Sequence, residues 1–433
     1  MAGSSGEKTP LVLEGSIISP TTRTAFALGH VFNDLAAAMW FSYTLLFLQR
    51  VALLEPLGAG SLLLLGQVID ALMTPVFGLL VDKYPKKKAW HVLGSAMVFV
   101  SFPVLFGSFV TNPNRLSTMF VYVLSIMVFQ TGWAAVQISH LSMIPALTSS
   151  PLIRAELTAI RYSAQVGAAV VVFVVTWIVL PTSSAAGARL GPEDIYKFRN
   201  IVVVLCLFGS ISTILFHAFL KARLLEASGG SSPARTSSAA SVEASFQQQD
   251  GGNGLIRNGK ENFGVRRSSI ASASSTSGWL SAGVLGRVAL LYVASRLFIT
   301  LATVYLPLYI EETAIAGRQA LATVPMLSYS SSFVTALLLK YINRSCGTKT
   351  CYLLGGLTGL LAATTVEFAQ SGVGTMYGVA VLIGAGSSIT MVTALSITAE
   401  MIGPRTESSA LVYSIVTFLD KVVTGLVVLL IER

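Results

Sequence analysis

The sequence predicts an all-α membrane protein whose helices form two similar halves. Of its 433 residues, 53% are hydrophobic and only 11% are charged, and the mean hydropathy is +0.71. A soluble protein of this length has no interior large enough for so much apolar surface, whereas a lipid bilayer accepts it. Several apolar runs also approach the roughly 20 residues that a helix needs to cross the hydrocarbon core.

The apolar runs predict eleven transmembrane helices, which we place at residues 25–49, 59–81, 90–110, 117–139, 157–180, 201–220, 288–310, 320–341, 350–370, 375–399 and 408–431. The segment between the sixth and seventh helices is rich in Ser, Gly, Ala and Gln, which is typical of disorder. The chain therefore divides into a tail (1–24), a six-helix half (25–221), a disordered linker (222–280) and a five-helix half (281–433). Two equal halves would give twelve helices, so we expect the last one to be absent.

An internal repeat supports the division into halves. The fourth predicted helix contains GWAAVQISHLSMIPAL from Gly132, and the tenth contains GSSITMVTALSITAEM from Gly386. Gly, Leu and Ser recur in both at the same spacing. Such repeats are common in transporters that bind a solute between two halves near the bilayer midplane.

Basic residues predict the orientation. Most of the 29 Lys and Arg lie in short loops, and the turn 82–88, DKYPKKK, is the most basic of them. The positive-inside rule then places the N-terminus and this turn in the cytosol. We expect Asp82, Lys86, Lys87 and Lys88 to act in cytosolic gating, with a partner segment near residues 340–349. Because the net charge of +9 is spread over such loops, it does not indicate nucleic-acid binding.

Six charged residues stand out in the interior of predicted helices, away from the helix ends, three acidic and three basic: Asp34, Asp70, Asp420, Arg161, Arg296 and Lys421. Each costs roughly 2.5–3.5 kcal/mol at mid-bilayer unless it has a partner or a wet cavity. Adjacent Asp420 and Lys421 lie about 100° apart on a helix, so they should face different partners. A set with both signs suits a zwitterion such as an amino acid. A sugar would also accept these hydrogen bonds, and static pairs that lock helices together are the alternative.

The fourth predicted helix carries a polar face. Trp133, Gln137 and His140 follow at spacings of four and three, so they share one side of the helix and are candidates to line a cavity. A histidine near a helix end is often structural, but its titration range also suits a proton. We therefore group His140 with Asp70 and Asp420 as candidate coupling residues, and Trp133, Gln137 and Arg296 with the candidate substrate contacts.

The sequence resembles the glycoside-pentoside-hexuronide:cation symporters, the melibiose-carrier branch of the major facilitators. The segments that carry the resemblance are GQVIDALMTPVFGLLVDKYPKKKAW, HVFNDLAAAMWFSYTLLFLQ, QISHLSMIP, LTAIRYSAQVG and VYSIVTFLDKV. It implies a major facilitator fold working by alternating access. It also implies that Asp34, Arg161 and Lys421 stand where that family has substrate-contacting residues in helices 1, 5 and 11.

The same resemblance bears on the coupling ion. The family's cation site has three acidic residues, and their positions here hold Asp70, Thr74 and Gln137. A sodium site needs hard and preferably anionic oxygen ligands. Two of the three acidic ligands are missing here, so we expect the coupling ion to be a proton, or no ion to be coupled, rather than sodium.

Within that family, FNDLAAAMWFSYTLLFL, GWAAVQISHLSMIP and FLDKV are similar to an animal subgroup implicated in carrying cysteine into lysosomes and melanosomes, and through this in pigmentation. The resemblance implies a cysteine or related amino-acid transporter of those membranes. The alternatives are a sugar or hexuronide symporter and a non-transporting scaffold, which the missing last helix favours slightly. With no metal cluster, nucleophile–base pair or phosphate loop in the sequence, we expect neither an enzyme nor a cofactor.

Two short motifs predict regulation. EKTPLV, with Glu7 and Leu11, is close to an acidic dileucine signal that a sorting adaptor would bind. RRSSI offers a phosphorylation site at Ser269 in the linker, although a solvated basic pair is the simpler interpretation.

Overall fold

The computed structural model of the chain describes residues 18–84, 86–107, 115–148, 151–180, 189–221, 282–313, 317–368, 372–402 and 406–433. The predicted linker lies outside the described residues, as do Glu7, Leu11 and Ser269. The sorting and phosphorylation motifs therefore stay predictions.

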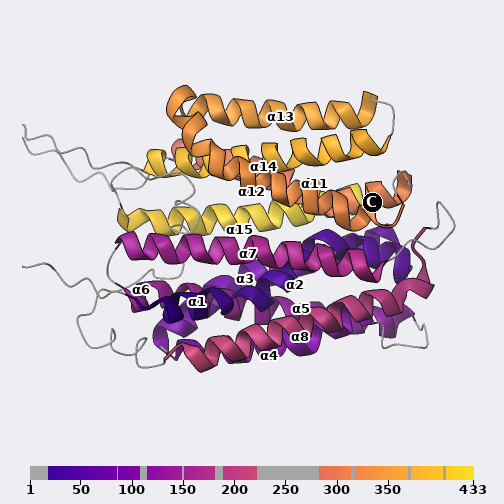
Figure 1. Cartoon of the computed structure of the whole chain (residues 1–433), viewed down its shortest axis with the longest axis horizontal. Coiled ribbons are helices and arrows are strands. Elements are labelled where there is room, and N and C mark those ends of the chain that lie inside the picture. Colours follow the sequence, from indigo (N-terminus) through magenta and orange to yellow (C-terminus); the bar gives the residue numbers. More distant parts are fainter. Residues whose placement is uncertain are drawn as a thin grey trace, which may run out of the picture.

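The described chain is a bundle of long helices (Figure 1). The amino-terminal half contains α1 (Pro20–Leu28), α2 (Val31–Leu46), the π-helical turn η1 (Phe47–Val51), α3 (Pro56–Lys83), α4 (Lys87–Gly107), α5 (Arg115–Leu141), α6 (Met143–Leu147), α7 (Pro151–Val179), the 3₁₀ turn η2 (Pro192–Asp194) and α8 (Ile195–Phe219). The carboxyl-terminal half contains α11 (Ala282–Thr313), α12 (Ala320–Cys346), α13 (Thr348–Phe368), α14 (Val373–Ile402) and α15 (Thr406–Ile431). Within the described residues, ten helical segments are long and apolar enough to cross a membrane. With α15 they match the eleven predicted helices, which confirms the predicted fold class.

The first predicted helix shows the largest differences. It begins at Pro20 rather than near residue 25, because the Ser19 side chain accepts the Thr22 N–H and caps the helix. It is interrupted at Gly29, where an added Cβ would lie 2.6 Å from the Phe216 ring of α8. The chain thus forms α1 and α2, and the absent side chain lets α8 approach the break.

The two halves meet along their inner helices. In Figure 1, α15 lies between the carboxyl-terminal helices and α7, while α13 and α4 lie at opposite edges of the bundle. Helices α2, α3 and α7 pack against α11, α15 and α12, respectively. The Tyr43 hydroxyl donates to the Leu321 carbonyl (2.8 Å), and the Phe173 and Tyr329 rings contact with centroids 5.3 Å apart.

The outer faces carry exposed apolar side chains, including Leu79 on α3, Leu207 on α8 and Leu360 on α13. Extended apolar exposure of this kind indicates a lipid-facing surface. The loops gather at the two ends of the bundle. We call the end with the turn 82–88 the lysine-turn end, and the end with Arg50, Arg189 and Arg318 the arginine-cluster end.

Candidate functional site

All six predicted interior charges have charged partners. Lys421 Nζ lies 2.8 Å from Asp70 Oδ2, and Arg296 Nε lies 3.1 Å from Asp420 Oδ2. Arg161 Nη2 lies 4.0 Å from Asp34 Oδ1. The structure therefore groups the six residues into three pairs of opposite sign.

The Lys421–Asp70 pair joins the two halves, since Lys421 is on α15 and Asp70 is on α3. Lys421 also lies 3.4 Å from Thr74 Oγ1. The neighbouring Asp420 turns instead to Arg296 on α11, within its own half. This is the divergence that the 100° offset between adjacent helix positions predicts.

A small cavity lies beside these pairs at the contact between the halves. It is lined by Trp40, Phe41, Leu63, Gln67, Thr300, Val304, Thr424, Gly425 and Val428, and its volume is ≈ 10 Å³. Its polar lining residues each lie one helical turn from an ion-pair residue: Thr300 follows Arg296, Thr424 follows Asp420 and Gln67 precedes Asp70. The cavity is only large enough for about one water molecule. A solute can enter here only if the halves separate.

Asp34 and Arg161, both predicted substrate contacts, do meet, but inside the amino-terminal half. His30, which was not predicted, lies between them: its Nδ1 is 2.8 Å from Asp34 Oδ1, and Arg161 Nη2 is 2.9 and 3.0 Å from the two ring nitrogens. All three side chains are buried. Asp34 Oδ2 has no hydrogen-bond partner among the described residues.

The predicted polar face of α5 separates into two environments. Trp133 Nε1 donates to Gln137 Oε1 at 2.9 Å, and the Trp133 ring meets Phe41 of the central cavity edge-on. His140 lies apart from them: its Nε2 is 2.8 Å from the Phe26 carbonyl, and its ring stacks on Phe26. Gln137 and Trp133 are thus placed beside the central cavity and His140 towards the lysine-turn end.

The lysine turn binds helix ends of its own half. Lys87 Nζ donates to the Ser142 carbonyl (2.8 Å), and Lys88 Nζ donates to the carbonyls of His217 (2.9 Å) and Leu220 (2.7 Å). Cations satisfy carbonyls well at helix carboxyl ends. Asp82 and Lys86 are exposed. Five of the ten residues in the proposed partner segment have side chains outside the described part of the chain, so gating across the halves stays a prediction.

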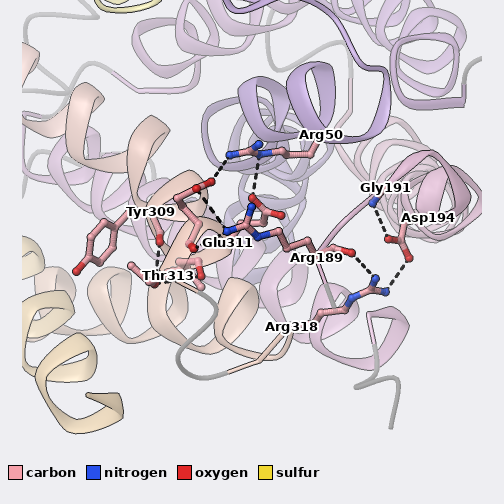
Figure 2. Close-up of polar contacts among 10 residues, drawn as sticks. Arg50, Arg189, Gly191, Asp194, Tyr309, Glu311, Thr313 and Arg318 are labelled. Atoms are coloured by element: carbon pink, nitrogen blue, oxygen red, sulfur yellow. Dashed lines mark hydrogen bonds and ion pairs between the residues drawn. The ribbon is translucent and has the colours of Figure 1, made fainter. Parts of the chain in front are cut away.

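The arginine-cluster end holds a network that the sequence analysis missed (Figure 2). Arg50, at the end of the first transmembrane segment, lies 2.9 Å from Glu311 and 2.5 Å from Glu312 of α11. Arg189 lies 3.5 Å from Glu312. These pairs connect the two halves.

A second part of the network is centred on Arg318. Its guanidinium lies 2.8 Å from Asp194 Oδ1 and donates to the Arg189 carbonyl at 2.7 Å, as Figure 2 shows. Lys197, in the same half as Asp194, approaches the same carboxylate at 2.9 Å. Close to this end, Glu432 accepts hydrogen bonds from Gln49 and from the Tyr305 hydroxyl. The halves are therefore closed against each other at the arginine-cluster end.

Comparison with known proteins places this geometry in context. The sequence model of the family described as MFS/sugar transport protein matches residues 25–243. Mouse major facilitator superfamily domain-containing protein 12 is 34% identical over 432 residues, an alignment that covers 96% of this chain and 85% of the mouse protein. That similarity confirms the resemblance found in the motifs.

Solved structures support the fold. The partially occluded inward-open xylose transporter XylE from E. coli superposes with a TM-score of 0.62 at 11% identity, over 95% of this chain and 90% of XylE. The nucleoside transporter NupG gives a TM-score of 0.63 at 9% identity, over 94% of this chain and 90% of NupG. At these identities the likeness concerns the fold alone. Among the described residues, no cluster of His, Cys, Asp and Glu has the arrangement of a metal site.

Proposed function

Because this chain belongs to the major facilitator superfamily of membrane transporters, we propose that it carries a small amino acid, preferably cysteine, by alternating access. The observation that carries the proposal is the Lys421–Asp70 pair, which joins the halves at 2.8 Å beside the closed central cavity. Any movement that opens a path between α3 and α15 must break this pair.

A zwitterionic solute compensates for that break. Separating this partly buried ion pair leaves two charges without partners, and losing one partner of a fully buried pair typically costs about 3–5 kcal/mol. An amino acid offers a carboxylate to Lys421 and an ammonium group to Asp70, so both charges stay satisfied while the halves are apart. A neutral sugar supplies hydrogen bonds but no charge. This difference favours the amino acid over the sugar.

The residues around the central cavity favour a substrate with a small side chain. The cavity is bounded by Trp40 and Phe41 on one side and by Thr300 and Thr424 on the other. Sulfur packs well against aromatic rings, and the motif resemblance implies cysteine as the substrate. We further propose that the lysine-turn end faces the cytosol and that the protein resides in the lysosomal or melanosomal membrane, as the loop charges and the resemblance support.

The coupling ion that fits best is a proton. Asp70, the one acidic residue at the three expected cation positions, is already paired with Lys421. Thr74 and Gln137 at the other two positions are neutral and engaged, Thr74 with Asp70 and Gln137 with Trp133. A sodium ion would have to displace an ammonium group to reach a single carboxylate. Replacing sodium in the assay below should leave uptake unchanged.

The test is uptake of labelled cysteine into sealed vesicles that contain the full chain. Asp34→Ala, Arg161→Ala and Lys421→Ala should each abolish uptake while the protein still reaches the membrane. Arg199→Ala removes an exposed basic residue of α8 and serves as the matched control. Uptake that persists in all three variants would refute the site. Inhibition by sugars but not by amino acids would support a sugar symporter, and absence of any flux would support a scaffold.

A further inference from the structure

The ion pair between Arg50 and Glu311 joins the two halves at the arginine-cluster end, but its hydrogen bonds are incomplete. Arg50 Nε and Glu311 Oε2 are 2.9 Å apart, which is an ionic contact. Even so, neither Arg50 Nε nor either carboxylate oxygen of Glu311 has a hydrogen-bond partner among the described residues. The charges of this pair are therefore satisfied, whereas one buried donor and two buried acceptors are not.

Glu311 is the most buried of the four charged side chains that meet here. Its side chain is only 3% exposed, whereas those of Glu312 and Arg189 are each 56% exposed and that of Arg50 is 35% exposed. Water can therefore satisfy Glu312 but has little access to Glu311. A buried carboxylate without hydrogen bonds costs free energy, so such a group calls for an explanation.

The backbone is irregular at the residue that forms this pair. The last turn of the first transmembrane segment, η1, is π-helical, and the Ala52 N–H donates to the Phe47 carbonyl five residues earlier. From this turn Arg50 reaches across to the carboxylate of Glu311 on α11 (Figure 2). Single π-helical turns are rare and often occur at functional sites. The incomplete ion pair and the irregular turn therefore coincide.

The missing hydrogen-bond partners have the chemistry of a zwitterion. A guanidinium N–H needs an acceptor, and a carboxylate group supplies one in a charge-assisted hydrogen bond. The oxygens of Glu311 need donors, and an ammonium group carries three N–H bonds. An α-amino acid has both groups on one carbon atom, so a single small molecule can bind Arg50 and Glu311 together.

Binding of such a solute leaves every charge of this group paired. When its carboxylate binds Arg50 and its ammonium group binds Glu311, Glu312 still has Arg189 at 3.5 Å. The solute adds one charge of each sign, so the net charge of the site does not change. It also replaces a direct contact of 2.9 Å by two hydrogen bonds with the solute between them. The two halves therefore have to move apart at this end.

We propose that Arg50 and Glu311 form a second site for a zwitterionic amino acid, and that its occupation opens the arginine-cluster end. The inference rests on the proposed transport function, because it concerns the same class of solute. It adds a binding site outside the central cavity and a way for the solute itself to release the contact between the halves.

The second site lies nearer the arginine-cluster end than the central cavity does. Along α11 the cavity residue Val304 comes first, and Glu311 follows seven residues later, about 10 Å further along the helix axis. Tyr305, between them in the sequence, donates to Glu432 at 2.8 Å. A solute that arrives from this side therefore meets Arg50 and Glu311 before the cavity. With the lysine-turn end in the cytosol, as proposed above, the second site responds to amino acids in the opposite compartment.

The test is a distance measurement by pulsed electron paramagnetic resonance on the full chain in vesicles. Spin labels at Asn200→Cys, on α8, and Gln319→Cys, directly before α12, report the separation of the halves at this end, and both positions are exposed. Cys346→Ser removes the exposed native thiol, while Cys206 and Cys351 are buried. Glycine is the probe, because it carries only the two charged groups that the site should recognise.

Glycine should increase the population with the longer distance. A ligand that binds only the open arrangement raises the ratio of open to closed by one plus the ratio of its concentration to Kd, which is about elevenfold at ten times Kd. Methylammonium and acetate each supply only one of the two charges, so neither should change the distances. A population that glycine leaves unchanged would overturn the second site.

Paired variants separate binding from a general weakening of this end. Arg50→Met with Glu311→Met keeps an apolar contact between the halves but has no charges, so glycine should not change its distances. The exchanged pair, Arg50→Glu with Glu311→Arg, can bind the solute in the reverse direction and should keep the response. Arg199→Ala removes an exposed charge of α8 and should respond like the wild type. A full glycine response in the methionine pair would refute the assignment of these two residues.

Uptake of labelled cysteine decides the proposed function separately. Cysteine uptake without a distance response to glycine would refute the second site alone. A distance response without any uptake would support the second site and refute transport.

Discussion

Removing Arg318 should open the arginine-cluster end. Arg318 lies between α11 and α12, and it reaches across to the amino-terminal half at 2.8 Å from Asp194 Oδ1 and 2.7 Å from the Arg189 carbonyl. The two paired side chains are only 10% and 2% exposed. Water therefore screens the pair little, and it should contribute more than a surface ion pair.

The size of the effect follows from these contacts. Hydrogen bonds that involve a charged group contribute about 1.5–3 kcal/mol each. In Arg318→Ala, Asp194 keeps Lys197 at 2.9 Å, so no buried carboxylate is left alone. We therefore expect a net loss of about 2 kcal/mol, which shifts the population towards states open at this end by about thirtyfold.

The assay is the rate at which a membrane-impermeant maleimide, added on the arginine-cluster side, labels a cysteine placed in the central cavity. Thr300→Cys supplies the target, and Cys346→Ser removes the exposed native thiol, while Cys206 and Cys351 are buried. The matched control is Lys197→Ala, because its contact with Asp194 stays within one half. A labelling rate in Arg318→Ala no higher than that of the control would refute the assignment of this network as a gate.

Two further predictions concern stability. Lys421→Ala should lower the free energy of unfolding by about 3 kcal/mol, because Asp70 loses its partner, whereas Asp70→Asn with Lys421→Met should recover most of the stability but not transport. Thermal unfolding and uptake measurements on the single and the double variant check this prediction. Full recovery of transport in the double variant would contradict the role of the charges. Gly94→Val should cost about 1–3 kcal/mol through overpacking, since a Cβ there lies 2.7 Å from the Gly132 carbonyl. Gly356→Val, where a Cβ meets nothing within 4 Å, should leave the melting temperature unchanged; equal losses in both would argue against the close approach of α4 and α5.

The number and placement of the helices were predictable because the bilayer imposes one length on every apolar run. The details at the first helix were not. The break at Gly29 depends on how closely Phe216 approaches, and the π-helical turn η1 has no counterpart in the hydropathy pattern. Both are consequences of tertiary packing, which a single apolar run does not encode.

The interior charged residues were also predictable, because a charge inside the bilayer is costly and stands out in an apolar run. Their partners were not predictable. Pairing depends on how each helix is rotated, and only the divergence of Asp420 and Lys421 could be deduced from the spacing. The rings of His30, His91, His140 and His217 come together from four helices that are far apart in the chain. The one local sign of this grouping was the four-residue spacing of His30 and Asp34, which places two polar groups on one helix face. The arginine cluster was missed because its members were treated as loop charges.

The three interior ion pairs have an electrical consequence. Each pair joins one anion and one cation, so together they carry no net charge. A rocking movement of the empty transporter then displaces little charge across the bilayer, although moving one elementary charge through 100 mV would be worth about 2.3 kcal/mol. A zwitterionic solute also adds none, whereas one bound proton adds a single positive charge. The return of the empty transporter should thus be nearly independent of voltage, and a current should arise only when substrate and proton cross together.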